Sequence, residues 1–175
     1  MSTQSEISGT AASAALVFFR CPKEVDSGEL YARLAVENGV SGCDAVLGSW
    51  DIALRVEAEN REALKAMVEK IGTTYATDAI EAHYSEEAPA IQQNNTGKAA
   101  SYAILDVDST KLPDLRAKLS SANFVARGDV TDGGKQIILL MRGNSSKKLR
   151  DAARNDIRFW PGVLRVKQLD ALSFS

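Results

Sequence analysis

The chain has 175 residues, of which 45% are hydrophobic and 25% are charged, and its formal net charge is −2. This composition is typical of a globular protein of one or two domains and excludes collagen-like, disordered and disulfide-rich classes. The longest apolar run, at 11–19, is too short to cross a bilayer and follows no basic segment. We therefore expect a cytoplasmic protein without a transmembrane helix or signal peptide. Cys21 and Cys43 match neither a disulfide framework nor a metal-binding motif.

The first half of the chain predicts an arm followed by alternating strands and helices. Residues 1–13 are rich in Ser, Thr, Gly and Ala without periodicity, which is typical of a disordered arm. The spacing of apolar residues, with turn and capping residues between them, then defines six elements. These are a strand from 14 that ends at Pro22, a helix from Asp26 or Ser27 to Glu37, strands at 40–47 and 50–58, a helix after Asn60 that includes Ile71, and a strand at 77–84.

The second half of the chain repeats the first. When the sequence is shifted by 85 positions, ten residues between 30 and 64 meet identical residues between 115 and 149 without a gap. The second copy accordingly predicts strands at 102–107, 124–131, 135–142 and 163–172, and helices at 112–122 and 146–157. Residues 85–98, with Pro89 and a run of Gln and Asn, predict a flexible linker between a first repeat at 14–84 and a second at 99–175.

Each predicted repeat has the order β-α-β-β-α-β, which is the ferredoxin-like arrangement with both helices on one face of an antiparallel sheet. The face without helices needs cover. We therefore predict an α+β fold in which the two repeats pack sheet to sheet as an α/β barrel or sandwich. Residues 1–97 carry a net charge of −8 and residues 98–175 a net charge of +6, which favours docking of one copy against the other. Drift on solvated faces is the alternative.

Two motifs carry a family resemblance. Gly48, Trp50 and Asp51 form a Gly-x-aromatic-Asp turn in the first repeat, and Trp160-Pro-Gly-Val precedes the last strand of the second. With these motifs the chain resembles tandem effector-binding (RAM/ACT-like) domains of the Lrp/AsnC family, the leucine-responsive regulators, within the dimeric α/β-barrel superfamily. Members of that family usually carry an N-terminal helix-turn-helix. Residues 1–13 are too short for one, so we do not expect direct nucleic-acid binding.

The resemblance implies a ligand site at the turn formed by Gly48, Ser49, Trp50 and Asp51. In that site the amides of Gly48 and Ser49 would face a carboxylate, Asp51 would take an ammonium group, and Trp50 would cover the apolar part of an amino acid. A lysine and a glutamine replace Trp50 and Asp51 in the second repeat, which leaves at most one such site. The alternative is structural: Gly48 makes the turn, Asp51 bonds its own turn, and Trp50 packs at an interface.

His83 is the single histidine and falls on a predicted strand. A surface or interface position is the favoured interpretation, and an axial ligand of haem, as in some α/β-barrel enzymes, is the other. A pocket of Tyr31, Trp50, His83 and Tyr102 would suit a cofactor-free oxygenase or isomerase. Nothing in the sequence places these side chains together.

A basic stripe follows one helix of the second repeat, at Lys147, Lys148, Arg150, Arg154 and Arg158. The recurrence of arginine every four residues places Arg150, Arg154 and Arg158 on one helix face. Aspartates dilute the stripe and no aromatic residues interleave with it. We interpret it as a solvated face or a contact with the acidic first copy rather than a nucleic-acid surface.

The favoured interpretation of the sequence is a stand-alone regulatory module without enzymatic activity. It would bind a small-molecule effector, with an amino acid as the first choice, assemble into a homo-oligomer, and need no cofactor, metal or membrane. The alternative is a small dimeric α/β-barrel enzyme of the cofactor-free oxygenase or isomerase type, with haem dependence as its less favoured variant.

Overall fold

The computed structural model describes residues 13–75 and 79–172, so the expected arm lies outside the described residues except for Ser13. The chain divides into two compact units. The first unit contains the residues up to Ala45 together with Trp50–Ala88, and the second contains Val46–Ser49 together with the residues from Pro89 onward. Each unit holds one of the two repeats expected from the sequence, except that Val46–Ser49 of the first repeat groups with the second unit.

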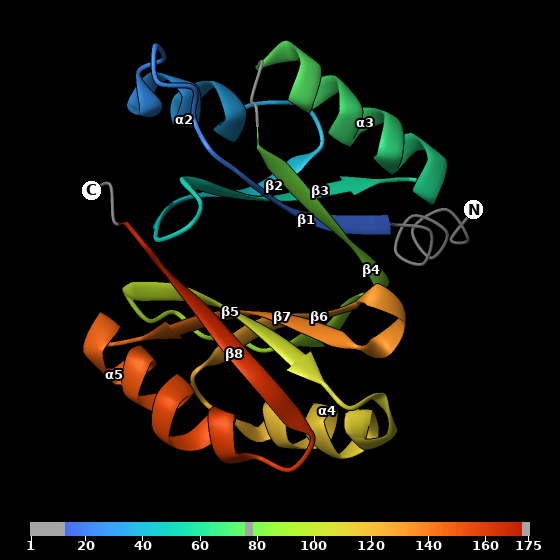
Figure 1. Cartoon of the computed structure of the whole chain (residues 1–175), viewed down its shortest axis with the longest axis vertical. Helices are drawn as coiled ribbons and strands as arrows, with labels where there is room; N and C mark the ends of the chain where they lie inside the picture. Colours follow the sequence, from blue (N-terminus) through green and yellow to red (C-terminus); the bar gives the residue numbers. More distant parts are fainter. Residues whose placement is uncertain (1–12, 76–78, 173–175) are drawn as a thin grey trace, which may run out of the picture. The chain divides into compact units, whose positions relative to one another are not determined.

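The elements of the first repeat follow the predicted order β-α-β-β-α-β. They are β1 (Ser13–Phe19), α2 (Ser27–Ala35), β2 (Val40–Leu47), β3 (Ile52–Ala58), α3 (Arg61–Thr74) and β4 (Ile80–Gln92). β1 pairs antiparallel with β3 on one side and with β4 on the other, and β2 pairs with β3. This strand order and the two helices on one sheet face confirm the ferredoxin-like prediction (Figure 1).

Short polar side chains start both helices of the first repeat where the sequence predicts them. The Asp26 carboxylate accepts hydrogen bonds from the amides of Gly28 and Glu29, and the Asn60 side chain accepts one from Ala63. Such bonds satisfy amides that have no partner within the first helical turn. After α2 the chain turns at Gly39, whose φ of 90° is a conformation that glycine adopts without steric cost.

The second repeat has the same order of elements. They are β5 (Ala99–Val107), α4 (Leu112–Ser121), β6 (Val125–Thr131), β7 (Gln136–Gly143), α5 (Ser146–Asp151) and β8 (Val163–Ala171). β5 lies between β7 and β8, and β6 pairs with β7, all antiparallel. α5 continues through a π-helical segment, Ala152–Asp156, and a 3-10 turn, Ile157–Phe159.

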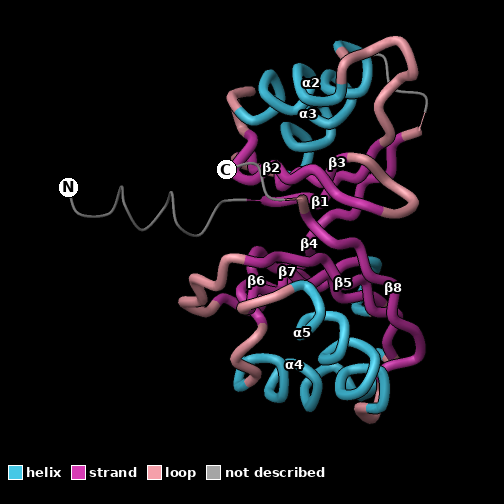
Figure 2. The backbone as a smooth tube through the Cα atoms, turned by 90° about the vertical axis from the view of Figure 1, so that its left-hand side faces the viewer, coloured by secondary structure: helices cyan, strands magenta, loops and turns pink. Residues whose placement is uncertain are grey.

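Each repeat packs its helices on its own sheet (Figure 2), and the side chains between them form a separate hydrophobic core in each repeat. Leu34, Leu54 and Leu64 are at most 1% exposed in the first core, and Leu119 and Leu139 are 0% exposed in the second. Equivalent repeat positions therefore fill both cores, as the shift of 85 positions requires. The predicted α+β class is confirmed. No helix within the described ranges is both long and apolar enough to span a bilayer.

The structure corrects the segment expected to be a flexible linker. β4 does not end at Tyr84 but continues to Gln92, and Ile91 is 3% exposed in the core of the second repeat. Beyond the strand, the amide of Gln93 donates to the carbonyl of Ala126 at 2.9 Å. The physical reason is that the Ile91 side chain is buried in the second core and the backbone after the strand is hydrogen-bonded. Pro89 and the polar run predict turns and do not indicate these contacts.

Candidate functional site

The two halves of the predicted turn site fall in different units, with Gly48 and Ser49 in the second and Trp50 and Asp51 in the first. Gly48 has a φ of 130°, and a Cβ atom at this position would lie 2.8 Å from Cδ2 of Leu169. The backbone conformation therefore favours glycine strongly, and a larger residue would also displace the end of the Leu169 side chain. This accounts for Gly48 structurally, and the assignment of a ligand to these four residues stays a prediction.

Asp51 closes the segment that follows β1. Its carboxylate Oδ2 accepts a hydrogen bond from the amide of Cys21 at 2.9 Å, and its own amide donates to the carbonyl of Phe19 at 3.0 Å. Beside it, the guanidinium of Arg20 lies 5.6 Å from the ring centroid of Trp50. Burial raises the pKa of the Cys21 thiol, and the Asp51 charge raises that pKa further.

A polar row crosses the face of the first sheet that carries no helices. Leu16 on β1 lies directly opposite Arg55 on β3 and directly opposite His83 on β4. Residues directly opposite one another in neighbouring strands share a sheet face. The alternate residues of β1, Ala15 and Val17, belong to the core under the helices. Arg55, Leu16 and His83 therefore lie side by side on the opposite, helix-free face.

Solvent exposure increases along this row from Arg55 to His83, and it increases further at Glu81 beside His83. Arg55 is 4% exposed, the His83 side chain is 13% exposed, and the Glu81 side chain is 50% exposed. His83 Nε2 lies 2.5 Å from Glu81 Oε1, and the Phe18 ring packs edge-on against the imidazole at 5.8 Å between centroids. The imidazole is thus fixed between an aromatic ring and a carboxylate, with a buried guanidinium two strands away.

The same positions of the second repeat are apolar. Tyr102 on β5 lies directly opposite Leu140 on β7 and Leu169 on β8, and these leucines correspond to Arg55 and His83. The two sheets share a backbone pattern, so the fold itself does not require a guanidinium and an imidazole at these positions. At these positions the first repeat carries a guanidinium, which can bind an anion, and an imidazole, which can transfer a proton.

The imagined pocket of aromatic residues does not form within the first unit. The Tyr31 hydroxyl donates to the carbonyl of Cys43 at 3.2 Å and packs with the core on the helix side of the sheet. His83 lies on the other face. Burial, followed by the charge of Asp44, raises the pKa of the Cys43 thiol to about 12, which removes this thiol as a nucleophile near neutral pH. No cluster of metal-ligating side chains occurs in the described part of the chain.

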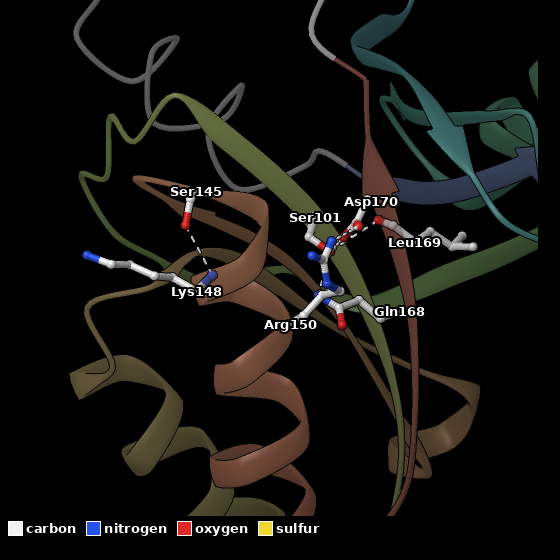
Figure 3. Close-up of polar contacts among 7 residues, drawn as sticks. All are labelled: Ser101, Ser145, Lys148, Arg150, Gln168, Leu169 and Asp170. Carbon is white, nitrogen blue, oxygen red and sulfur yellow. Dashed lines mark hydrogen bonds and ion pairs between the residues drawn. The ribbon is translucent and has the colours of Figure 1, made fainter.

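The predicted basic stripe divides into residues with different partners. Arg150 Nη1 donates to Asp170 Oδ2 at 3.0 Å, and Asp170 Oδ1 accepts a hydrogen bond from the buried hydroxyl of Ser101 at 3.2 Å (Figure 3). Lys147 forms an ion pair with Asp151 at 3.0 Å. Arg150 therefore ties α5 to the end of β8, so the stripe does not present five equivalent cations.

Arg55 and Glu81 were not singled out in the sequence. The shift of 85 positions places Arg55 on Leu140, and this loss of a charge within an apolar strand is the signal that could have identified it. His83 matches Leu169 only with a shift of 86 positions. The pair of Leu16 and His83 corresponds to the pair of Tyr102 and Leu169, and both members are displaced by 86 rather than 85. Glu81 has no signal beyond its position two residues before His83.

No protein-family model matches the chain, and a sequence comparison with curated proteins gives no match. Several solved structures share its fold. The crystal structure of the siroheme decarboxylase NirDL has a TM-score of 0.70 at 8% identity, covering 97% of this chain and 74% of that one. A putative monooxygenase from Fusobacterium nucleatum subsp. nucleatum ATCC 25586 has a TM-score of 0.59 at 10% identity, covering 93% and 92%. An anthrone oxidase-like protein has a TM-score of 0.55 at 10% identity, covering 94% and 92%.

These comparisons correct the regulatory interpretation of the sequence. The three structures named above carry the names of enzymes or enzyme-like proteins, and none of the three is described as an amino-acid sensor or transcription regulator. The physical reason for the error lies in the turn motif: its glycine provides a positive φ, and its aspartate accepts a hydrogen bond from the amide of Cys21. At these identities the likeness establishes the ferredoxin-like α+β fold of this chain.

Proposed function

We propose that the chain is an enzyme that removes a proton from an anionic organic substrate, with His83 as the base and Arg55 as the group that holds the negative charge. The observation that carries the proposal is the contrast between repeats: Arg55 and His83 occupy one row of the first sheet where the second sheet has Leu140 and Leu169. The fold itself does not need a guanidinium or an imidazole at these positions, because the second sheet forms with leucines there. A catalytic role explains why they are present.

The chemistry follows from the two side chains. The C–H or O–H bond next to a substrate carbonyl breaks, the proton moves to His83, and the electron pair stays on the substrate as an enolate or phenolate. The Arg55 guanidinium would stabilise that anion, and the more strongly because little water surrounds it. Glu81 would position the imidazole: its carboxylate contacts Nε2, and Nδ1 is the ring atom that would accept the substrate proton.

The fate of the anion separates two enzyme types. Return of the proton to another atom gives an isomerase, whereas reaction of the anion with molecular oxygen gives an oxygenase. The names of the putative monooxygenase and the anthrone oxidase-like protein support the second type. For His83 as a haem ligand, the Nε2 atom that usually binds iron already contacts Glu81, which favours the proton-transfer role. Homo-oligomer formation and a cytoplasmic location stay predictions.

The single histidine makes a direct test possible, because its imidazole C–H signals are the only ones of their kind in the NMR spectrum. We would add acetoacetate and benzoate as anionic probes to the wild type and to Arg55→Leu. The His83 signals are expected to move in the wild type and to remain in place in the variant. Proton exchange of acetoacetate in heavy water and oxygen uptake with acetoacetate would then be measured for both proteins and for His83→Asn.

A matched control removes an arginine elsewhere. Arg154 is exposed on the π-helical segment of the second repeat, so Arg154→Leu changes the net charge as Arg55→Leu does. It should leave the probe response intact. Exchange or oxygen uptake that persists in both Arg55→Leu and His83→Asn would contradict the proposal, as would His83 signals that respond to neither anion. Activity that fails only in the His83 variant would leave Arg55 without a role.

A further inference from the structure

The second repeat contains an open cleft of about 730 Å³ that the proposed chemistry does not use. It lies between the chain segment that follows β4, the start of β6 and the first turn of α5, with Asn95, Phe124 and Lys148 among its lining residues. Sites for small molecules commonly have volumes of about 300–1,000 Å³. The cleft therefore has room for a ligand of nucleotide size.

The charge of the cleft is uniformly positive. Lys98, Arg142 and Lys148 line it, and no aspartate or glutamate does. None of these three cations forms an ion pair with an acidic residue in the described part of the chain. Neighbouring basic residues behave differently, since Lys147 pairs with Asp151. Three neighbouring cations without an acidic partner favour the binding of an anionic ligand in the cleft.

The cleft wall is held by an organised set of hydrogen bonds. The Asn95 side chain donates to the carbonyls of Asn123 and Arg142, at 3.0 Å each, and accepts a hydrogen bond from the Gly97 amide at 3.0 Å. The Arg142 guanidinium donates to the Gly97 carbonyl at 3.3 Å. The backbones of Gly97 and Gly143 are so close that a Cβ atom on Gly97 would lie 2.5 Å from the Gly143 amide nitrogen. The polar wall is thus formed before any ligand binds, which lowers the entropy cost of binding.

α5 presents Lys148 to this wall. The Ser145 hydroxyl accepts a hydrogen bond from the Lys148 amide at 3.2 Å, so the first turn of the helix is capped, and the Lys148 side chain extends away from Arg150 (Figure 3). Arg150 is bound to Asp170. Two basic residues of one helix therefore have separate roles, one structural and one available to a ligand.

The cleft also has an apolar part. Phe124, Leu149 and Ala152 line it, and the Phe124 ring is supported by Trp160 at 6.3 Å between centroids. An inorganic anion would use only the cations. A ligand with a flat body would in addition contact the Phe124 ring and the amides of the surrounding asparagines.

We propose that this cleft binds a mononucleotide, with the phosphates near Lys98, Arg142 and Lys148 and the base against Phe124. The three parts of the wall match the three parts of such a ligand: cations for phosphate, amides for polar base edges, and an aromatic ring for the base plane. The site is separate from Arg55 and His83 in sequence and in unit, so its test is independent of the proposed enzymatic activity.

Binding of ADP to the full chain, measured by isothermal titration calorimetry, tests the proposal, with adenosine and inorganic phosphate as comparison probes. ADP should bind more tightly than either comparison probe, and its affinity should fall as salt is raised. The double variant Lys98→Ala/Lys148→Ala should weaken ADP binding about tenfold or more, because two charge-assisted contacts are lost. Both lysines are exposed, so the fold should persist.

The matched control is Lys135→Ala/Lys147→Ala, which removes two exposed lysines that do not line the cleft. It should change ADP affinity less than twofold. The proposal is overturned if ADP gives no binding heat at millimolar concentration, if inorganic phosphate binds as tightly as ADP, or if the control loses as much affinity as the cleft variant. Phe124→Leu should lower the affinity for ADP more than the affinity for phosphate. An equal loss of both affinities would contradict the placement of the base against Phe124.

Discussion

Removal of the Asp51 carboxylate separates its structural role from the ligand role expected for it. In Asp51→Ala the acceptor of the Cys21 amide, at 2.9 Å in the wild type, is lost. A hydrogen bond at an exposed position contributes about 1 kcal/mol to the free energy of unfolding. For a chain of this size, 1 kcal/mol corresponds to a fall in Tm of about 2–4 °C. Asp51→Asn keeps a side-chain oxygen acceptor and should lose less.

The same substitution changes the reactivity of a nearby thiol. The Asp51 charge contributes, after burial, to the raised pKa of Cys21. Without that charge the thiolate forms more readily, so alkylation of Cys21 by iodoacetamide at pH 8 should accelerate. An interaction of about 0.2–1 kcal/mol between exposed charges corresponds to a factor of about 1.5–5 in rate. Cys43 is the internal control, because its pKa of about 12 is set by burial and Asp44.

Thermal melts of the ligand-free protein and mass spectrometry of the alkylated peptides provide both measurements. Asp51→Ala is expected to melt lower than Asp51→Asn, with faster alkylation of Cys21 and no change at Cys43. An unchanged Tm together with unchanged Cys21 kinetics would refute the reasoning and return Asp51 to the set of residues free to bind a ligand. Faster alkylation of both cysteines would instead indicate general loosening of the first repeat.

Three further predictions concern stability. Tyr75→Phe loses the 2.6 Å hydrogen bond to Glu37, which is worth about 1.5 kcal/mol. Because this bond raises the pKa of Tyr75, the difference in Tm between wild type and variant should be constant below pH 10 and should shrink above it. A difference in Tm that stays constant to pH 12 would contradict this. Gly97→Ala should lower the Tm because its Cβ meets the Gly143 backbone, and a neutral result would show that this wall can move. Leu54→Ala should cost about 3 kcal/mol or more in urea unfolding, since Leu54 is 0% exposed, and a cost below 1 kcal/mol would exclude a rigid core there.

Local signals in the sequence predicted most elements of the fold. Asp26 and Asn60 start helices because a short side chain near free amides acts over a few residues. The internal repeat extended the same conclusion to the second half of the chain. The extension of β4 depends instead on where Ile91 packs, and the shortening of α5 depends on a π-helical segment, Ala152–Asp156. Neither is encoded by a local pattern.

The candidate site was less accessible to sequence reasoning. The hydrogen-bond partner of the Asp51 carboxylate is the amide of Cys21, which lies 30 residues earlier in the chain. The turn motif by itself does not reveal this partner. The Arg55 and His83 row depends on the register of three strands, which a single sequence does not give. Comparison of the repeats pointed to the turn, where two adjacent residues differ. It did not single out the difference between Arg55 and Leu140, because the apolar residues around them follow the same pattern in both repeats.

Short segments from the first half of the chain belong to the second unit, which has a consequence for how the chain can be divided. Val46–Ser49 belongs with the second unit although the first repeat encodes it, and the end of β4 supplies Ile91 to the second core. A cut between the sequence repeats, after residue 98, would therefore remove the buried Ile91 side chain from the second core and separate Val46–Ser49 from the rest of the second unit. A truncation intended to isolate the second unit would need to begin before Ile91 and would still lack Val46–Ser49.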